Sequence, residues 1–320
     1  MVKNPRWIVY SLIFIALLFI PRILSIHDLM LFEYGITFAI VGLRFNLLLG
    51  YTGLLSFGHG AYFATGAYTV AMIAKYLPQA YSLEILIPAA LFFSLVLSII
   101  FGFVCVRHTK IFFSILTLSL SMLLFALLFK LYHLTGGSDG LRVPLPTMFG
   151  MSFKGIRRPE FLSGTYYYFL LGMFSVSFLV MKGIVSSPFG KALQAVRDNE
   201  VRAELIGIRV RRYRLYAFII SGMFVGLGGA LWTFVNGHVT ADLSHWVFSG
   251  EIVYMTLLGG FGIFEGPIVG AIIFTYLKLY AMGNTQYWMF VIGGTLIVLV
   301  LLLPNGIAGA FAGLWTKIKK

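Results

Sequence analysis

Residues 85–106 read ILIPAALFFSLVLSIIFGFVCV and contain no aspartate, glutamate, lysine or arginine. A helix rises about 1.5 Å per residue, and about 20 apolar residues are enough to cross the hydrocarbon core of a bilayer. Charged side chains are rare in such a core because their transfer out of water is costly. This stretch therefore predicts a transmembrane helix.

The composition of the whole chain agrees with a membrane protein rather than a soluble domain. Of its 320 residues, 59% are hydrophobic and only 11% are charged, whereas soluble domains have about 45 to 50% apolar and about 25% charged residues. The one cysteine, Cys105, excludes an intramolecular disulfide and a cysteine-rich metal site. We therefore expect the lipid bilayer to surround the chain.

Similar stretches predict an all-α protein with about ten transmembrane helices, within a range of eight to ten. Further stretches without charged residues are Ile111–Phe129, Phe161–Met181, Leu215–Val235 and Tyr287–Leu303. Stretches that carry glycines, polar residues or an occasional charge are Leu29–Leu49, Leu54–Leu77, Trp246–Leu258 and Ile263–Ala281. We expect this second group to contain interior, broken or re-entrant helices, and Trp246–Leu258 to be short for a full crossing.

The first apolar stretch, Trp7–Ile26, is interrupted by Pro21 and Arg22. No small-residue cleavage site follows it, so we interpret it as a retained anchor rather than a signal peptide. The chain is expected to form one transmembrane domain over residues 1–320. Its parts are the N-terminal anchor (1–28), a first helical half (29–134), an outer loop (135–163), a second helical half (164–303) containing an inner loop (182–214), and a tail (304–320).

The basic residues predict the orientation of the chain in the membrane. With ten spans, most of the 24 lysines and arginines fall on one side, and cytoplasmic loops are enriched in these residues. Both termini are therefore expected in the cytoplasm, and the net charge of +13 reflects topology, which argues against nucleic acid as a partner. The segments concerned hold Lys3 and Arg6, Arg107 and Lys110, the basic residues of the inner loop, and Lys317, Lys319 and Lys320.

The outer loop from Thr135 to Leu162 opens with the run GGSDG and contains two prolines and several charges, including Lys154. It is long enough to receive a partner protein. A solvated connector is an equally good interpretation of this composition, and the sequence leaves both open.

The inner loop reads KGIVSSPFGKALQAVRDNEVRAELIGIRVRRYRL from Lys182 to Leu215. Ser187 is a preferred N-cap, Pro188 suits the first turn of a helix, and Gly207 is a typical helix stop. An apolar stripe of Ala192, Leu193 and Val196 lies between these signals. The loop therefore predicts two short helices at the membrane surface.

The exposed faces of these two helices are expected to carry charges of both signs. They comprise Arg197, Asp198, Asn199, Glu200, Arg202 and Glu204. A helix that only lies on anionic lipid is basic with few acids, so the mixed charge favours a protein partner. A basic connector with helical tendency, anchored by Arg209, Arg211, Arg212 and Arg214, is the alternative.

Three stretches resemble a known family of transport proteins. Residues 192–208, ALQAVRDNEVRAELIGI, resemble the ATPase-coupling loop of bacterial ABC-importer permeases. Residues 46–62, NLLLGYTGLLSFGHGAY, and residues 258–271, LGGFGIFEGPIVGA, are similar to the M-type permease of branched-chain amino acid importers. The companion H-type subunit usually has Asn-Phe-Ala-His-Gly where this chain has Ser56-Phe57-Gly58-His59-Gly60.

The resemblance implies the larger-type ABC importer permease fold in a bacterial cytoplasmic (inner) membrane. It also implies a homologous H-type permease, two cytoplasmic ABC ATPases and an extracytoplasmic substrate-binding protein as partners. The segment Arg202-Ala203-Glu204-Leu205 departs from the Glu-Ala-Ala of other importer classes. The residues that the resemblance assigns to ATPase coupling are Ala192, Val196, Arg197, Asp198, Glu200, Ala203, Glu204 and Gly207.

Two glycine-rich clusters predict broken helices near a translocation pathway, because unwound backbone at membrane depth needs protein or a watery cavity beside it. The first cluster comprises Gly50, Gly53, Ser56, Gly58, His59 and Gly60, and the second Gly259, Gly260, Gly262 and Gly266. Helix ends there offer N–H groups to a carboxylate and carbonyls to an ammonium group. This suits an amino-acid zwitterion and equally a neutral amide such as urea. The spaced pairs Gly222/Gly226 and Gly266/Gly270 predict close helix packing.

Several ionisable residues fall within the expected spans. Glu33 and Arg44 are eleven residues apart and share a helix face, so we expect them to pair with each other or with a neighbouring helix. Glu251 and Lys278 are expected to pair as well, unless Lys278 snorkels outward. His59 among its glycines is expected to be a hydrogen-bonding group more than a proton carrier.

The sequence contains no motif for catalysis or for binding a cofactor. It lacks G-x-x-x-x-G-K-[ST] for ATP phosphates, H-E-x-x-H for zinc and a G-x-S-x-G nucleophile turn. We expect no enzymatic activity, so the energy source lies elsewhere. An ion-coupled secondary carrier using Glu33, Glu251 and His59 is the main alternative, with a membrane enzyme a third. The structured inner loop favours the ABC permease.

The inner loop also allows a comparison of variants. If residues 189–207 form helices that enter an ATPase, Glu200→Pro is expected to remove a backbone donor and cost about 3 kcal/mol or more of local helix stability. Reversing Glu204 to lysine would disturb an exposed ion pair worth under about 1 kcal/mol. We therefore expect the proline substitution to uncouple more severely.

Overall fold

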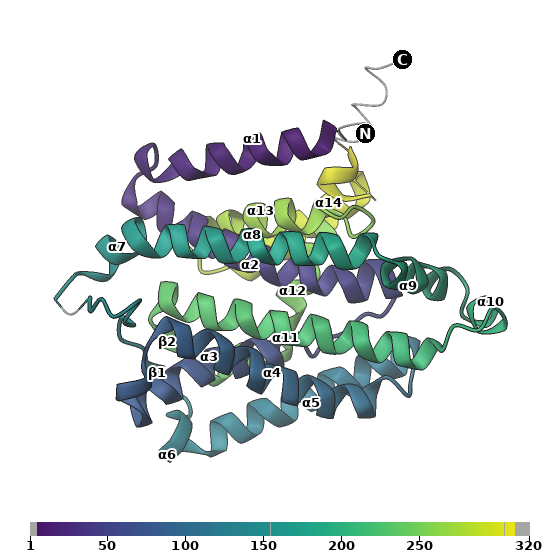
Figure 1. Cartoon of the computed structure of the whole chain (residues 1–320), viewed down its shortest axis with the longest axis horizontal. Helices are drawn as coiled ribbons and strands as arrows, with labels where there is room; N and C mark the ends of the chain where they lie inside the picture. The colour runs from purple at the N-terminus through teal and green to yellow at the C-terminus, as the bar shows by residue number, and fades with distance from the viewer. Residues whose placement is uncertain (1–4, 154, 304, 311–320) are drawn as a thin grey trace.

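The computed structural model describes residues 5–153, 155–303 and 305–310. Most of the chain forms long helices that run alongside one another, with short elements at the two ends of the bundle (Figure 1). The longer helices are α1 (Pro5–Phe19), α2 (Ile26–Thr52), α3 (His59–Tyr76), α4 (Leu83–Cys105), α5 (Lys110–Lys130), α8 (Tyr167–Ser186), α11 (Val210–Asn236), α12 (Trp246–Gly259), α13 (Gly266–Asn284) and α14 (Trp288–Leu302). The shorter helices are α6 (Tyr132–Thr135), α7 (Arg158–Phe161), α9 (Pro188–Asp198) and α10 (Glu200–Leu205).

The helices confirm an all-α membrane protein. Within the described ranges, seven helical stretches are long and apolar enough to cross a membrane. They comprise α2, α4, α5, the continuous stretch from α7 to α8, α11, α13 and the stretch that starts with α14. Helix α3, the short α12 and the N-terminal stretch complete the ten predicted segments. In the N-terminal stretch, α1 is followed by a 3-10 turn (Ile20–Arg22) that contains Pro21.

Two interruptions divide helices where the glycine clusters predict breaks. The chain leaves α2 through Gly53, whose φ of 72° is a left-handed helix end, and is non-helical until α3 begins at His59. A second break separates α12 from α13, with Gly260 at a φ of 101°. Both breaks are shorter than the clusters, because Gly50 remains within α2 and Gly60 lies in the first turn of α3.

Close packing around α11 forms the centre of the bundle. Helix α11 packs against α2, α3 and α4. A Cβ atom on Gly66 of α3 would overlap the carbonyl oxygen of Gly226, and one on Gly226 would overlap the side chain of Ser94 on α4. Gly222 lies against Tyr62 and Ser98 in the same way. The predicted role of Gly222 and Gly226 in helix packing is therefore confirmed.

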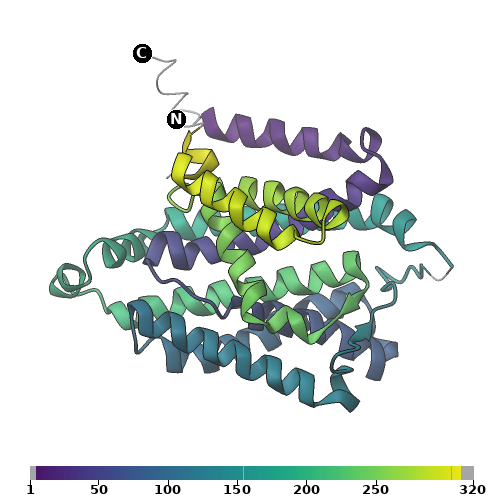
Figure 2. The same ribbon diagram turned by 180° about the vertical axis from the view of Figure 1, so that it is seen from behind.

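The outer loop is attached to the bundle rather than hanging free. Two short strands, β1 (Leu141–Arg142) and β2 (His238–Val239), pair antiparallel. The Val143 N–H donates to the Gly237 carbonyl (2.9 Å), and the Tyr81 hydroxyl donates to the Pro144 carbonyl (2.8 Å). These strands lie at one end of the bundle, and α9 and α10 lie at the opposite end (Figures 1 and 2). Lys154 falls outside the described residues.

Candidate functional site

The inner loop folds into the two predicted helices, α9 and α10. The hydroxyl oxygen of Ser187 accepts a hydrogen bond from the Gly190 N–H (3.4 Å), and Pro188 starts α9. Leu193 and Val196 are buried, whereas Ala192 is half-buried. Serine as N-cap followed by proline therefore starts the helix as the sequence indicates.

Helix α10 follows after a single extended residue, Asn199. The Asn199 side chain accepts a hydrogen bond from the Arg202 N–H (2.9 Å), so this residue is an N-cap. Sequence reasoning assigned it only to an exposed face, although asparagine is among the preferred N-caps. Gly207 follows the end of α10 with a φ of 88°, as expected for a helix stop.

One side of α10 is buried, and the other side carries exposed apolar side chains. Ala203 packs in a small cluster with Val196 and Val210. Leu205, Ile206 and Val201 are 82%, 70% and 67% exposed, beside the exposed Arg202 and Glu204. Exposed apolar residues rimmed by charges are typical of a protein contact. Sequence reasoning missed this patch because α10 is too short to show an apolar period.

Two of the charges predicted on the exposed face instead attach the loop to the bundle. Arg197 donates to the carbonyl of Gly50 (2.6 Å), which lies at the end of α2, where a cation is favourable. Glu200 accepts two hydrogen bonds from Arg214 of α11 (2.7 and 2.9 Å). Asp198 remains exposed and pairs with its neighbour Arg197 (2.9 Å).

The expected effect of Glu200→Pro is wrong. Glu200 is the first residue of α10, where the backbone N–H has no partner within the helix and proline is favoured. Asn199 before it is extended, which is the conformation that a following proline requires. This substitution would remove the ion pair with Arg214 and leave the helix intact.

The first helix break is organised around His59, which is fully buried. Its Nδ1 lies 2.9 Å from the Ser56 hydroxyl, and its Nε2 lies 2.9 Å from the Ser221 hydroxyl. Ser221 donates its single proton to the Arg44 carbonyl (2.8 Å), so Nε2 of His59 donates to Ser221 and Nδ1 accepts from Ser56. Neutral imidazole thus uses both nitrogens, in agreement with a hydrogen-bonding role.

The glycines of the two clusters mostly lie where another backbone comes close. Gly50, Gly58 and Gly60 face the carbonyls of Phe261, Thr117 and Leu243 respectively. In the second cluster, Gly259 and Gly266 face each other's backbone, and Gly260 lies against Asn305. Gly53 and Gly262 are exposed. A role of these residues in a translocation pathway stays a prediction.

The buried charges on α2 do not pair with each other. Arg44 donates to the carbonyl of Ser177 on α8 and lies over the ring of Phe224, with its Cζ 3.9 Å from the centroid. Both carboxyl oxygens of the fully buried Glu33 lack a hydrogen-bond partner among the described residues. Eleven residues align two side chains on one face but separate them by about 16 Å along the helix. The predicted contact with a neighbouring helix is therefore right for Arg44, and the pair with Glu33 is wrong.

The second expected pair is present. Lys278 of α13 donates to both carboxyl oxygens of Glu251 on α12 (2.7 Å each) and lies 5.6 Å from the centroid of the Trp288 ring. The prediction of an ion pair between consecutive late segments is therefore confirmed, and Lys278 does not turn away from its partner.

A third ionic cluster joins parts of the chain that are far apart in sequence. Glu265 accepts hydrogen bonds from the Tyr10 hydroxyl and from Nζ of Lys182 (3.0 Å). Burial raises the pKa of the Glu265 carboxyl, but these two hydrogen bonds, a backbone hydrogen bond and the positive charge of Lys182 together hold its pKa below the ordinary value. No sequence pattern links positions 10, 182 and 265. Within the described residues, no group of three or more His, Cys, Asp or Glu could hold a metal ion.

Comparisons with known proteins identify transport permeases as relatives of this chain. LivM, the high-affinity branched-chain amino acid transport system permease protein of Escherichia coli (strain K12), is 28% identical over 289 residues, which cover 84% of this chain and 67% of that protein. LivH of the same organism is 24% identical over 294 residues, covering 86% and 92%. MglC, the galactose/methyl galactoside import permease protein of Haemophilus influenzae, is 27% identical over 155 residues, covering 43% and 46%. No solved structure matches the chain significantly.

The family profile described as branched-chain amino acid transport system / permease component matches residues 29–300. This range includes both helix breaks, α9 and α10, and the buried charges. A permease of this kind is a multi-pass membrane subunit of an ABC transporter and is not itself catalytic. The chain therefore belongs to the branched-chain amino acid transport permease family.

Proposed function

We propose that this chain is the M-type permease of an ABC importer for branched-chain or related amino acids. It forms the translocation pathway together with a homologous H-type permease, and an extracytoplasmic binding protein delivers the solute to the outer end of the bundle. Two cytoplasmic ATPases supply the energy, one of them by contact with α9 and α10. The observation that carries the proposal is the α9–α10 unit. Its tip exposes apolar and charged side chains (Val201, Arg202, Glu204, Leu205 and Ile206), while the unit stays hydrogen-bonded to the bundle through Arg197 and Glu200.

The bonds of this unit give it a mechanical role. Arg197 attaches α9 to the end of α2, and Glu200 attaches α10 to the start of α11 through two hydrogen bonds. The cluster of Val196, Ala203 and Val210 fills the space between them. A connector without a partner would need none of these contacts. An ATPase that moves the tip therefore moves the inner ends of α2 and α11.

The proposed orientation follows from the same unit. If the ATPases are cytoplasmic, the end of the bundle that bears α9 and α10 is the inner end, and the end that bears β1 and β2 faces outward. Helix α1 begins and α14 ends at this same end of the bundle (Figure 1), which supports cytoplasmic termini, and the bacterial relatives support the inner membrane. Lys3 and the tail lysines Lys317, Lys319 and Lys320 lie outside the described residues.

The solute is proposed at the level of a chemical class. Helix ends at the two breaks provide N–H groups and carbonyls for a zwitterion, and a short amide or urea satisfies the same groups. One observation favours the ion-coupled alternative, namely the buried Glu33 carboxyl, which has no hydrogen-bond partner among the residues that the structure describes. His59 and Glu251, the other two residues that an ion-coupled carrier would use, already have hydrogen-bond partners within the chain.

Uptake in proteoliposomes distinguishes the two mechanisms. With the H-type permease, both ATPases and the binding protein present, uptake of radiolabelled leucine is expected to require ATP and the binding protein. It is expected to continue when an uncoupler and a sodium ionophore collapse the ion gradients at constant ATP. Loss of uptake under those conditions would favour the secondary carrier, and transport by the chain alone would contradict both the pairing and the ATPase dependence.

Replacing Arg197 with glutamine is expected to weaken coupling. The substitution removes the charged donor to Gly50, and such a bond in a partly exposed position is worth about 1 kcal/mol. We expect roughly fivefold less leucine transported per ATP hydrolysed. Lys191→Gln is the matched control because it removes the same charge from an exposed position on α9. If both variants transport the same amount of leucine per ATP hydrolysed, the contact between Arg197 and α2 does not contribute to coupling.

A further inference from the structure

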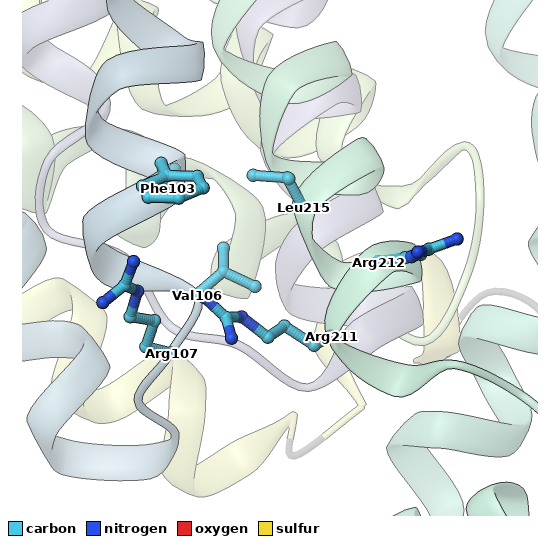
Figure 3. Close-up of a pocket in the computed structure, with 7 residues that line it drawn as sticks. Phe103, Val106, Arg107, Arg211, Arg212 and Leu215 are labelled. Carbon is cyan, nitrogen blue, oxygen red and sulfur yellow. The ribbon is translucent and has the colours of Figure 1, made fainter.

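A pocket of about 450 Å³ lies between the inner ends of α4 and α11. It is lined by Gly102, Phe103, Val106, Arg107, Arg211, Arg212 and Leu215 (Figure 3). The pocket is separate from the tip of α10 and from both helix breaks. Its lining combines three arginines with apolar side chains and includes no acidic residue.

In the described ranges of the chain, the basic side chains of the pocket have no ion-pair partner. Figure 3 shows Arg107, after the end of α4, and Arg211, in the first turn of α11, extending toward the same space, whereas Arg212 extends away from it. Within the described part of the chain, neither Arg107 nor Arg211 makes an ion pair or a side-chain hydrogen bond. The N-terminal end of α11 adds its own positive field there. Two cations and a helix N-terminus around one space attract an anion.

The other wall of the pocket is apolar and continues onto the surface of the bundle. Phe103 and Leu215 lie above the arginines, and the Arg107 guanidinium lies 4.8 Å from the centroid of the Phe103 ring. Along α4, the residues Phe92, Phe93, Val96, Ile99, Ile100, Phe103 and Val104 are all exposed. An apolar chain could follow this face from the pocket toward the middle of the membrane.

We propose that the pocket binds an anionic phospholipid. The phosphate lies between the Arg107 and Arg211 guanidinium groups, whose planar donors match phosphate oxygens. One acyl chain leaves over Phe103 and follows the exposed face of α4. Free inorganic phosphate offers the same anion, but it would leave the apolar wall without a ligand. Basic pockets between helices at the cytoplasmic side are suited to anionic headgroups. The placement in the inner leaflet rests on the proposed orientation.

A lipid at this position would affect the coupling unit. Its phosphate would join the end of α4 to the start of α11, and Arg214, in the first helical turns of α11, holds Glu200 of α10. The lipid also reduces the repulsion between the two arginines. It therefore fixes the point from which the α9–α10 unit is held.

Native mass spectrometry of the purified full-length chain tests this proposal without any transport measurement. The delipidated chain in detergent is titrated with phosphatidylglycerol and, separately, with phosphatidylcholine. We expect one tightly bound phosphatidylglycerol. The double variant Arg107→Gln/Arg211→Gln is expected to weaken its binding about 30-fold, which corresponds to about 2 kcal/mol, and each single variant by about fivefold.

The control variant is Lys191→Gln/Arg209→Gln, which removes two charges from the same end of the bundle outside the pocket. It should bind phosphatidylglycerol as the wild type does. Equal weakening in both double variants would show general charge attraction and overturn the proposal. Equal affinity for the two lipids, or displacement of phosphatidylglycerol by millimolar inorganic phosphate, would overturn it as well. Because the readout uses the chain alone, failure here leaves the proposed import function intact, and the reverse also holds.

Discussion

An Ala203→Pro variant is expected to lose substrate-stimulated ATP hydrolysis in the assembled transporter, while the chain reaches the membrane at the wild-type level. Ala203 is buried in α10, and its N–H donates to the Asn199 carbonyl (3.0 Å). Proline would remove this donor and place its ring against the preceding turn, at a cost of about 3 kcal/mol or more. A helix of six residues has no other turn to preserve it. The measurement is ATPase activity in proteoliposomes with loaded binding protein.

Glu200→Pro is the matched control for this variant. It introduces the same residue three positions earlier, where the first residue of α10 tolerates it. It also removes the ion pair with Arg214, so Glu200→Ala is needed to measure that loss separately. We expect the two changes at position 200 to behave alike. Full stimulation in Ala203→Pro would mean that α10 does not transmit motion, and the proposed coupling would be wrong.

The second large effect is expected from Gly66→Ala in the centre of the bundle. The added methyl group would overlap the carbonyl group of Gly226, which belongs to the rigid backbone of α11. Rotation of a side chain cannot relieve this overlap, so α3 and α11 must separate along a face where they pack closely. We expect the free energy of unfolding to fall by about 3 kcal/mol or more. Unfolding in sodium dodecyl sulfate, followed by tryptophan fluorescence, measures this change.

Gly172→Ala provides a control with the same added methyl group. Gly172 lies within α8, and a Cβ atom there would meet nothing within 4 Å. Because alanine favours a helix by about 0.8 to 1 kcal/mol over glycine, this variant should be equally stable or slightly more stable. Comparable losses in both variants would show that α3 and α11 do not depend on close approach at Gly66.

The sequence was sufficient for features that depend on local patterns. Uncharged apolar stretches of membrane length predicted the helices, and Ser187, Pro188 and Gly207 predicted the start and the end of the inner-loop helices. Glycines four residues apart predicted the contacts of α11. Each of these signals is contained in one short segment, and its physical cause acts within that segment or over one helix face.

Features that depend on long-range packing were beyond the sequence. The pairing of β1 with β2 joins residues almost 100 positions apart, and each strand has only two residues. The contact of Arg44 with the Ser177 carbonyl involves a backbone group that every residue possesses. The direction of Arg197 toward Gly50 depends on how α9 lies against α2. The mixed charge of the inner loop was visible, but its division into inward and outward groups was not.

Asn199, the single extended residue between α9 and α10, separates two attachments of the coupling unit to the bundle. On one side of Asn199 the chain is fastened to α2, in the first half of the sequence, and on the other side to α11, in the second half. The two attachments use different side chains, Arg197 for α2 and Glu200 for α11. Under the proposed coupling, a force applied at Leu205 and Ile206 would act as a torque about Asn199 and turn the inner end of α11 relative to that of α2. The hydrogen bonds of the buried His59 to Ser56 and Ser221 join the break between α2 and α3 to α11, and they would oppose such a rotation.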